Sequence, residues 1–277
     1  MSKSLALFSM AAANLGDFEL ANSLADDLLA TTSGGPWGYE FDVQTRWAHY
    51  PAGSPNVIAT SFAIRALSAL NRLPEVSDQT REWLRSLRRG PGYFAYTPMS
   101  DRLIHNGSLL AAESLMRLGE SPEVVADAVE VSVRAQRPDG SWPYGSGKDL
   151  EWIDNFHTAY VLESLHYLKS HGLVDERVLE LGVSYWLHNL FLPTGEPLYF
   201  ASSKSPSTDI HNVATAASAM ATLGLRSEQI GARASTLDLL RRFQDKDGAF
   251  KNHARSPVLM RWNQAHATYA LSKWTSQ

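Results

Sequence analysis

Histidines recur in this sequence where helix caps are expected, within the first turns of nearly apolar segments. His157 follows Asp154 by three residues, so on a helical turn the carboxylate can orient the imidazole and strengthen it as a base. Asn, Asp, Ser and Thr are favoured at helix starts because they bond to the backbone there, whereas imidazoles are not preferred caps. The sequence therefore predicts a catalytic cluster at Asp154, His157, His211 and His266. The alternative is that these histidines pack in the core and have no catalytic role.

Aromatic and polar side chains in the same segments, and in the loops that lead to them, suit the binding of a sugar. Rigid aromatic faces with polar edges can stack on sugar rings, and arginine pairs with carboxylates or phosphates through two hydrogen bonds. Helix capping is the alternative for the Asn and Asp residues, and repeat packing is the alternative for the aromatic residues. We predict substrate-binding roles for Trp37, Tyr39, Asp42, Arg46, Tyr96, Asn106, Trp152, Asn155, Asp209, Asn212, Arg261 and Asn263.

Three kinds of function are open to such a cluster. Proton abstraction at a uronate carbon would use His157 as the base, with a tyrosine or histidine across the sugar ring. Hydrolysis by paired carboxylates would use Asp154 and Asp209. A site that binds a glycan or an assembly partner without chemistry needs no tuned base.

The same histidines could hold a metal ion together with Asp154 or Asp209, because imidazole and carboxylate are common ligands. The spacing of helix starts does not specify a tetrahedral site, and no ligand motif such as His-Glu-x-x-His is present. The absence of cysteine excludes disulfides, cysteine-ligated zinc, iron–sulfur clusters and thiol nucleophiles. We therefore predict neither a metal nor another cofactor.

The composition is that of a globular protein with a large core, since 44% of the 277 residues are hydrophobic and 19% are charged. The 25 Lys and Arg residues are balanced by 29 Asp and Glu, and no basic face stands out, so nucleic acid is not an expected partner. No apolar run approaches the roughly 20 residues of a membrane span. We interpret the apolar N-terminal stretch as a helix rather than an export signal, and expect a cytoplasmic protein that binds a carbohydrate or another small molecule.

Nearly apolar helices rich in small residues recur along the chain, which indicates a repeat architecture. Aligning Leu67, Leu115, Leu165, Met220 and Leu271 spaces them 48 to 55 residues apart. Helices that are apolar all round must be buried. We predict such inner helices at residues 4–15, 56–70, 106–118, 155–168, 212–223 and 263–274.

A second kind of helix has apolar residues on one face only and precedes a glycine with aromatic neighbours. These outer helices are predicted at residues 18–29, 78–87, 124–136, 175–190 and 228–244. Apart from short extended pieces, no strand pattern is sustained. The alternation predicts an all-α fold: an α/α toroid of about five helix pairs plus an N-terminal inner helix, in a single domain over residues 1–277. The extra inner helix leaves oligomerisation open, because a second chain could complete the ring.

Residues 136–142, Gln-Arg-Pro-Asp-Gly-Ser-Trp, resemble the Gln-x-x-x-Gly-x-Trp signature of squalene and terpene cyclases. Residues 244–250, Gln-Asp-Lys-Asp-Gly-Ala-Phe, are a near copy. The chain thus resembles the prenyltransferase/squalene-terpene cyclase-like α/α-toroid repeat superfamily. In that signature the glutamine binds backbone groups after an outer helix and the aromatic ring packs on it, so the motif implies a fold and not a reaction.

Residues 38–46, 55–61 and 152–165 resemble toroid proteins of bacterial exopolysaccharide biosynthesis. Asp154-x-x-His157-Thr158, together with His105-Asn106-Gly107, is similar to the catalytic toroid of glucuronyl C5-epimerases. These resemblances imply a protein of bacterial surface-polysaccharide biosynthesis that binds or modifies a uronate-containing glycan in the central mouth of the toroid. One alternative is an isoprenoid or terpene cyclase, although no Asp-x-Asp-Asp motif is present. Another is a non-catalytic toroid that binds a glycan or a partner.

Overall fold

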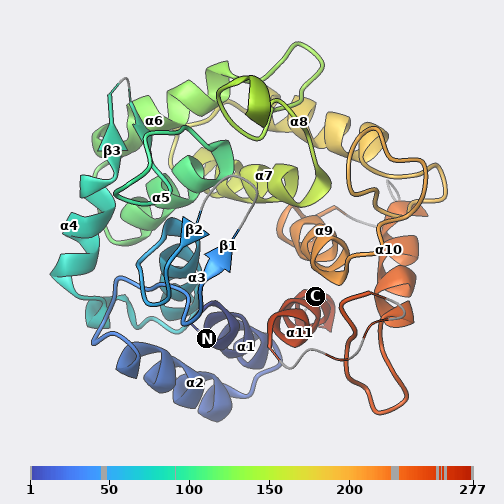
Figure 1. Cartoon of the computed structure of the whole chain (residues 1–277), viewed down its shortest axis with the longest axis horizontal. Coiled ribbons are helices and arrows are strands. Elements are labelled where there is room, and N and C mark those ends of the chain that lie inside the picture. Colours follow the sequence, from blue (N-terminus) through green and yellow to red (C-terminus); the bar gives the residue numbers. More distant parts are fainter. Residues whose placement is uncertain are drawn as a thin grey trace. The chain divides into compact units, whose positions relative to one another are not determined.

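A computed structural model describes residues 2–44, 49–90, 92–225, 231–253, 256, 258 and 261–275. Within these ranges the chain forms eleven α-helices, two short 3-10 helices and two small hairpins (Figure 1). The prediction of an all-α fold with almost no sheet is confirmed. None of the helices in these ranges is long and apolar enough to cross a membrane.

Two kinds of helix alternate along the chain, as the sequence predicts. The nearly apolar helices are α1 (Ser2–Asn14), α3 (Val57–Ala69), α5 (His105–Arg117), α7 (Asn155–Lys169), α9 (Ile210–Thr222) and α11 (Trp262–Thr275). The helices with one apolar face are α2 (Phe18–Ala30), α4 (Asp78–Ser86), α6 (Pro122–Arg134), α8 (Glu176–Asn189) and α10 (Gly231–Arg242). The predicted boundaries lie close to these, and the start predicted at residue 228 falls outside the described residues.

The extended pieces are short and local. Strand β1 (Val43–Gln44) pairs antiparallel with β2 (His49–Tyr50), and β3 (Arg88–Arg89) pairs antiparallel with β4 (Tyr93–Phe94). The 3-10 helices η1 (Leu73–Glu75) and η2 (Lys148–Leu150) lie in connecting segments. All of these elements shape the loops that lead from one helix to the next.

The contacts divide the chain into two compact units, one ending at Val131 and the other beginning at Ser132. In the first unit α1, α3 and α5 pack in succession, with α2 against α1 and α4 against α5 (Figure 1). In the second unit α7, α9 and α11 pack in succession, with α8 against α7 and α10 against α9. Each unit therefore has two layers of helices. That the chain is a single domain stays a prediction.

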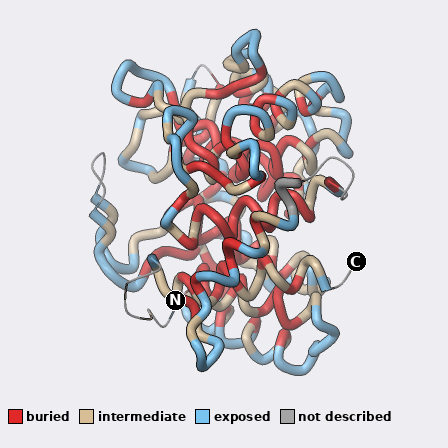
Figure 2. Tube along the Cα trace, turned by 90° about the vertical axis from the view of Figure 1, so that its right-hand side faces the viewer, coloured by how far each residue is buried: buried red, intermediate tan, exposed pale blue. Residues whose placement is uncertain are grey.

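The nearly apolar helices can pack closely because many of their side chains are small. In the second unit Ala214 and Ala217 of α9 share a core cluster with Ala267 and Ala270 of α11, and Phe243 packs into the same cluster. Helix α8, in contrast, buries a stripe of residues spaced three or fewer apart, namely Leu179, Gly182, Tyr185 and Trp186. Figure 2 shows buried residues concentrated along the helices and exposed residues mainly in the loops.

The first glutamine signature has the packing role that the resemblance implies. Gln136 Nε2 donates to the carbonyl of Gly140 at 3.1 Å and to a carbonyl of α8 at 2.9 Å. The Trp142 ring is buried, and its Nε1 donates to the carbonyl of Ser132 in α6 at 2.8 Å. Gly140 has a φ of +91°, and a Cβ there would lie 2.3 Å from the carbonyl oxygen of Leu181. Only glycine fits this turn.

Candidate functional site

Helix α7 begins with a carboxylate and an imidazole in direct contact. Asp154 Oδ1 accepts the backbone N–H of His157 at 2.8 Å, and Asp154 Oδ2 lies 2.7 Å from His157 Nδ1. The Asp154 side chain is 1% exposed, whereas that of His157 is 19% exposed. Because a carboxylate oxygen accepts, Nδ1 is the donor in this bond, and in the neutral form of the imidazole the lone pair is then on Nε2. None of the described residues hydrogen-bonds to His157 Nε2, so this nitrogen can meet a ligand.

Three partly exposed aromatic rings pack against His157. The ring centroid of Phe156 lies 3.8 Å from that of His157, and the centroids of Tyr144 and Trp152 lie at 4.4 Å and 5.4 Å. Tyr144 and Trp152 also stack on each other, with centroids 4.1 Å apart and planes inclined by 15°. We call Tyr144, Trp152 and Phe156 the aromatic rim. The rim brings the predicted binding residue Trp152 next to the predicted base.

The other two predicted imidazoles lie at the starts of the next inner helices in the same unit. His211 of α9 and His266 of α11 pack edge to face, with ring centroids 4.3 Å apart. Phe156 connects this pair to His157, because its centroid also lies 4.9 Å from that of His211. His266 is buried, whereas His211 is partly exposed. The structure therefore brings the predicted catalytic residues into one group of neighbouring side chains.

The site also contains Phe156, Tyr160 and Trp262, which the sequence predictions did not assign to it. The Tyr160 hydroxyl lies 3.1 Å from His211 Nε2, and the Trp262 ring packs against His211 with a centroid distance of 5.6 Å. The spacing on α7 carried a signal, since residues 157 and 160 are three apart and therefore share a helix face. In an apolar helix, however, such rings are indistinguishable from core residues by type alone.

The loop before α9 lies against the start of α7. Phe200 forms an antiparallel bridge with Asp154, and the Asn155 N–H donates to the Tyr199 carbonyl at 3.0 Å. Burial raises the pKa of Tyr199 to about 12, and the nearby carboxylates of Asp154 and Asp209 contribute to the increase. The phenol is therefore neutral near pH 7, and it lies near both predicted carboxylates.

The two carboxylates are poorly placed for paired-carboxylate hydrolysis. Both oxygens of Asp154 are bonded to His157, one to the backbone and one to the ring. Asp209 caps α9 by accepting the His211 N–H at 2.9 Å, and burial raises the pKa of its carboxyl group. Hydrolysis needs one carboxylate that attacks or activates water and a second that protonates the leaving group. Since Asp154 is occupied by His157, proton transfer by the imidazole fits this geometry better.

The predicted asparagines of this unit are buried. Asn155 Nδ2 donates to the Leu190 carbonyl at the end of α8 at 2.6 Å, and its Oδ1 accepts Trp186 Nε1 at 2.9 Å. Asn212 Nδ2 donates to a carbonyl of the loop before α9 at 3.0 Å, and Asn263 is 1% exposed. These contacts favour a structural role, which was the alternative interpretation. The function proposed below does not use the asparagines.

The predicted charged binding residues are scattered. Arg261 is exposed directly before α11, in the same unit as His157. Asp42 is exposed in the first unit, where its Oδ1 accepts the Ala52 N–H at 2.7 Å. Arg46 lies outside the described residues. Like Asp209, which caps α9, Arg261 belongs to a segment that also contributes to the site.

The remaining predicted residues lie in the first unit. Trp37 is fully buried, and its Nε1 donates to a carbonyl of α2 at 3.0 Å, which matches the packing role of the signature tryptophan. Tyr39 is buried, and burial raises its pKa well above the ordinary value. Tyr96 is partly exposed with its ring centroid 5.3 Å from that of Tyr50, and Asn106 is 2% exposed. Burial favours packing for Trp37 and Asn106.

The grouping of imidazoles does not resemble a metal centre. Over the described part of the chain, no group of three or more His, Asp or Glu side chains is arranged to hold a metal ion. His157 Nδ1 is already bonded to Asp154, and the Phe156 ring contacts both His157 and His211. The site consists of packed aromatic and imidazole rings.

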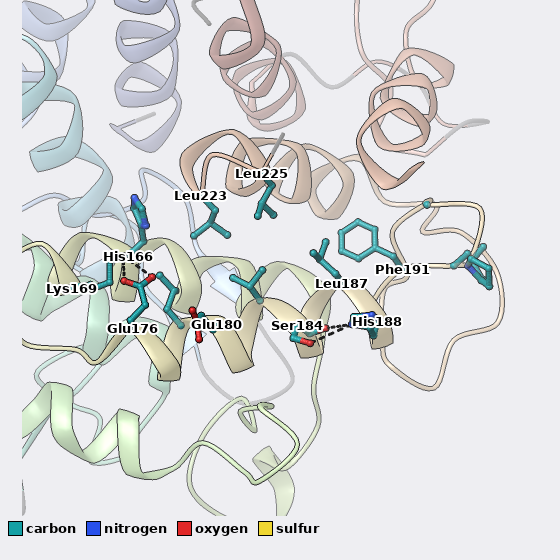
Figure 3. A pocket seen from close by; sticks show the side chains of 15 residues that line it. His166, Lys169, Glu176, Glu180, Ser184, Leu187, His188, Phe191, Leu223 and Leu225 are labelled. Carbon is teal, nitrogen blue, oxygen red and sulfur yellow. Dashed lines mark hydrogen bonds and ion pairs between the residues drawn. The ribbon is translucent and has the colours of Figure 1, made fainter. Parts of the chain in front are cut away.

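A cavity of about 870 Å³ lies along α8 in the second unit (Figure 3). Its walls include Leu179, Val183 and Leu187 of α8, and it extends to His166 and Lys169 in the last turn of α7. None of the residues predicted from the sequence lines it. The predicted catalytic cluster lies at the opposite end of α7, so this cavity and the predicted site are separate.

The chain's sequence matches no family model and no curated protein. Solved structures match its fold. A Salmonella enterica protein assigned as a possible member of the GH105 family matches with a TM-score of 0.70 and 12% identity, over 99% of this chain and 82% of that one. The type II terpene cyclase MstE from Scytonema matches with a TM-score of 0.66 and 18% identity, over 99% and 86% of the two chains.

A third match is the unsaturated glucuronyl hydrolase from Bacillus sp. GL1, with a TM-score of 0.54 and 17% identity over 78% of this chain and 71% of that one. The matched proteins are α/α toroids. At these identities the likeness shows the fold alone. The chain therefore has the α/α-toroid fold that its repeats predict.

Proposed function

We propose that this toroid binds a uronate-containing glycan at the aromatic rim and abstracts a proton from it with His157. The observation that carries the proposal is the pairing of Asp154 with His157 at 2.7 Å, with the carboxylate buried and the imidazole partly exposed. A general base needs a fixed tautomer and a lone pair within reach of the substrate. The pair meets both conditions.

The aromatic rim supports a sugar as the substrate. Tyr144 and Trp152 are partly exposed and both contact His157, so a sugar ring stacked on either would lie beside the base. The guanidinium of Arg261 is suited to a uronate carboxylate. Two of the matched structures carry names of sugar-acting proteins, the GH105 family and an unsaturated glucuronyl hydrolase.

In the proposed chemistry the most acidic C–H group is the one on the carbon next to the uronate carboxylate, because the carboxylate can accept the electron pair that remains. His157 Nε2 takes this proton, and the electron pair of the broken bond moves into the carboxylate group. The Asp154 carboxylate stabilises the imidazolium that forms, because its Oδ2 accepts the Nδ1–H. The base is thereby held in orientation throughout the step.

The biological setting that we propose is bacterial surface-polysaccharide biosynthesis in the cytoplasm. Its support is the resemblance of residues 38–46, 55–61 and 152–165 to toroid proteins of exopolysaccharide biosynthesis. The site residues Trp152, Asp154 and His157 all fall within the last of these stretches.

The test uses the full chain with heparosan, alginate and polygalacturonate in D₂O. We expect the wild type to introduce deuterium next to the carboxylate of one polymer, and His157→Asn to lower this rate by about 100-fold or more. The variant should stay within about 1–2 kcal/mol of the wild type in stability, because the ring is partly exposed. His188→Asn, an exposed histidine of α8, is the matched control.

The other outcomes of this experiment have clear meanings. If the chain bound a polymer but introduced no deuterium, the protein would be a glycan-binding toroid without catalytic activity. Unfolding of His157→Asn, with a stable His188→Asn control, would make His157 a structural residue. Neither result is compatible with the proposed base.

Isoprenoid cyclisation is the second candidate, and the density of aromatic rings favours it. Phe156, Tyr160 and Trp262 all lie around His211, and aromatic faces stabilise cations. The sequence lacks the Asp-x-Asp-Asp acid of the protonating cyclases. Isoprenoid cyclisation would be supported if the chain converted geranylgeranyl diphosphate to a cyclic product and introduced no deuterium into any uronate polymer.

A further inference from the structure

The cavity along α8 has apolar walls on two facing sides. Leu179, Val183 and Leu187 of α8 form one wall, and Leu223 and Leu225 at the end of α9 form the other (Figure 3). The lining positions on α8 run from residue 176 to residue 188, a length of about 18 Å at the rise of an α-helix. A volume of about 870 Å³ is typical of a pocket for a small molecule. The cavity is therefore suited to an elongated apolar ligand.

The end of the cavity at α7 is polar. Lys169 Nζ donates to both carboxylate oxygens of Glu176, at 2.9 Å and 2.7 Å, and Glu180 adds a second carboxylate one turn further along α8. His166 lines the same end and is partly buried. Burial lowers the pKa of His166, and the positive charge of Lys169 lowers it further. The imidazole is therefore neutral near pH 7, and it can both donate and accept a hydrogen bond.

The charges at this end disfavour a charged ligand of either sign. An anionic group would meet the carboxylates of Glu176 and Glu180, and a cationic group would meet the ammonium of Lys169. A hydroxyl group can exchange hydrogen bonds with the neutral His166 without meeting a like charge.

The apolar walls disfavour a peptide. A peptide carries an N–H and a carbonyl at nearly every residue, and these groups would lack partners between leucine and valine side chains. A hydrocarbon chain has no such groups, and each methylene that it buries contributes to binding.

We propose that this cavity binds a single-chain lipid with an uncharged, hydroxyl-bearing head group. The chain lies between the wall of α8 and the wall formed by Leu223 and Leu225, and the head group lies beside His166. This end of α7 is opposite to the one that begins with Asp154 and His157. The lipid site is thus separate from the glycan site, and the inference does not depend on the proposed function.

The experiment is calorimetric titration of the full chain with monodecanoylglycerol, decanoate and decyltrimethylammonium, each below its micellar concentration. We expect the neutral lipid to bind at least about 10-fold more tightly than either ion, because each ion meets a like charge at the polar end. Monooctanoylglycerol should bind more weakly than monodecanoylglycerol by roughly 10-fold, because two fewer methylenes are buried.

Two variants test the location of the lipid. Val183→Trp and Leu223→Trp should each weaken binding by about 10-fold or more, since the added ring takes the place of several methylenes. Both positions are partly exposed, and thermal unfolding verifies that each variant is folded. Arg177→Trp is the matched control, because it places the same ring on an exposed part of α8 outside the cavity and should bind as the wild type does.

Failure of monodecanoylglycerol to bind the wild type would overturn the inference, and so would tighter binding of either ion. Wild-type affinity in the folded tryptophan variants would place the lipid elsewhere, with the same consequence. If the wild type dimerised in analytical ultracentrifugation and Val183→Trp, but not Arg177→Trp, abolished the dimer, the occupant would be a second copy of the chain and not a lipid. Deuterium uptake by uronate polymers tests the proposed function separately from all of these results.

Discussion

Asp154 uses its two oxygens for two different tasks, capping α7 and orienting His157. Asp154→Asn keeps an oxygen that can cap the helix, since Asn is as good a cap as Asp. Its amide N–H, however, can turn toward Nδ1 and favour the wrong tautomer of His157. We predict a free energy of unfolding within about 1 kcal/mol of the wild type and a deuterium-uptake rate lower by about 100-fold or more.

Chemical denaturation and the D₂O assay measure these two quantities on the same samples. Asp154→Ala provides the contrast, because it removes the cap as well and should cost about 1 kcal/mol in addition to activity. Wild-type activity in Asp154→Asn would contradict the role assigned to the carboxylate.

Helices α3 and α5 of the first unit are joined by a buried carboxylate between two guanidiniums. Glu113 is 1% exposed, Arg65 Nε donates to its Oε1 at 2.8 Å, and Arg117 Nε donates to the same oxygen at 2.8 Å. Burial alone would raise the pKa of Glu113, but the charges and hydrogen bonds of the two arginines outweigh it and lower the pKa to about 2. The pairing of these helices therefore depends on ionisation.

Because folding changes the pKa of Glu113, the free energy of unfolding depends on pH. The pKa of Glu113 in the folded chain is lower than the ordinary value of 4.5, so its stabilisation is complete above about pH 4.5 and is lost as the pH falls toward 2. The shift corresponds to about 3 kcal/mol. Urea titrations should show the free energy of unfolding of the wild type falling more steeply over this range than that of Glu113→Gln. Parallel pH profiles would contradict the assignment.

At the scale of the whole chain, helix α6 begins in the first compact unit and ends in the second. Neither unit can unfold completely without disrupting this helix. We predict that calorimetry of the full chain shows one transition, with equal calorimetric and van't Hoff enthalpies, as expected for a single domain. Two resolved transitions would contradict the single-domain prediction.

The helices could be predicted closely because their signals are local. Apolar periodicity and repeat spacing depend on neighbouring residues, and both kinds of helix fall near their predicted positions. The grouping of His157, His211 and His266 could also be predicted, since aligned repeats place equivalent helix starts together. Here a long-range contact followed from a local pattern.

Other parts of the site could not be predicted from residue type. Phe156 and Tyr160 stand in a nearly apolar helix, where a ring that contacts an imidazole and a ring in the core have the same spacing. Asn155 and Asn212 were predicted to bind substrate, but their amides bond to backbone carbonyls of the chain. The direction of a polar side chain at a helix start depends on the packing of the next element, which spacing does not reveal.

The two hydrogen bonds that Asp154 makes, one to the backbone and one to the His157 ring, also affect how such a protein would evolve. Replacing His157 would end the proposed reaction while α7 kept its cap, whereas replacing Asp154 would damage the reaction and the helix together. Mutational drift in descendants that no longer need the reaction should therefore reach position 157 before position 154. Among relatives that retain the aspartate, the residue at position 157 would then distinguish lineages that still perform the chemistry from those that have kept only the scaffold.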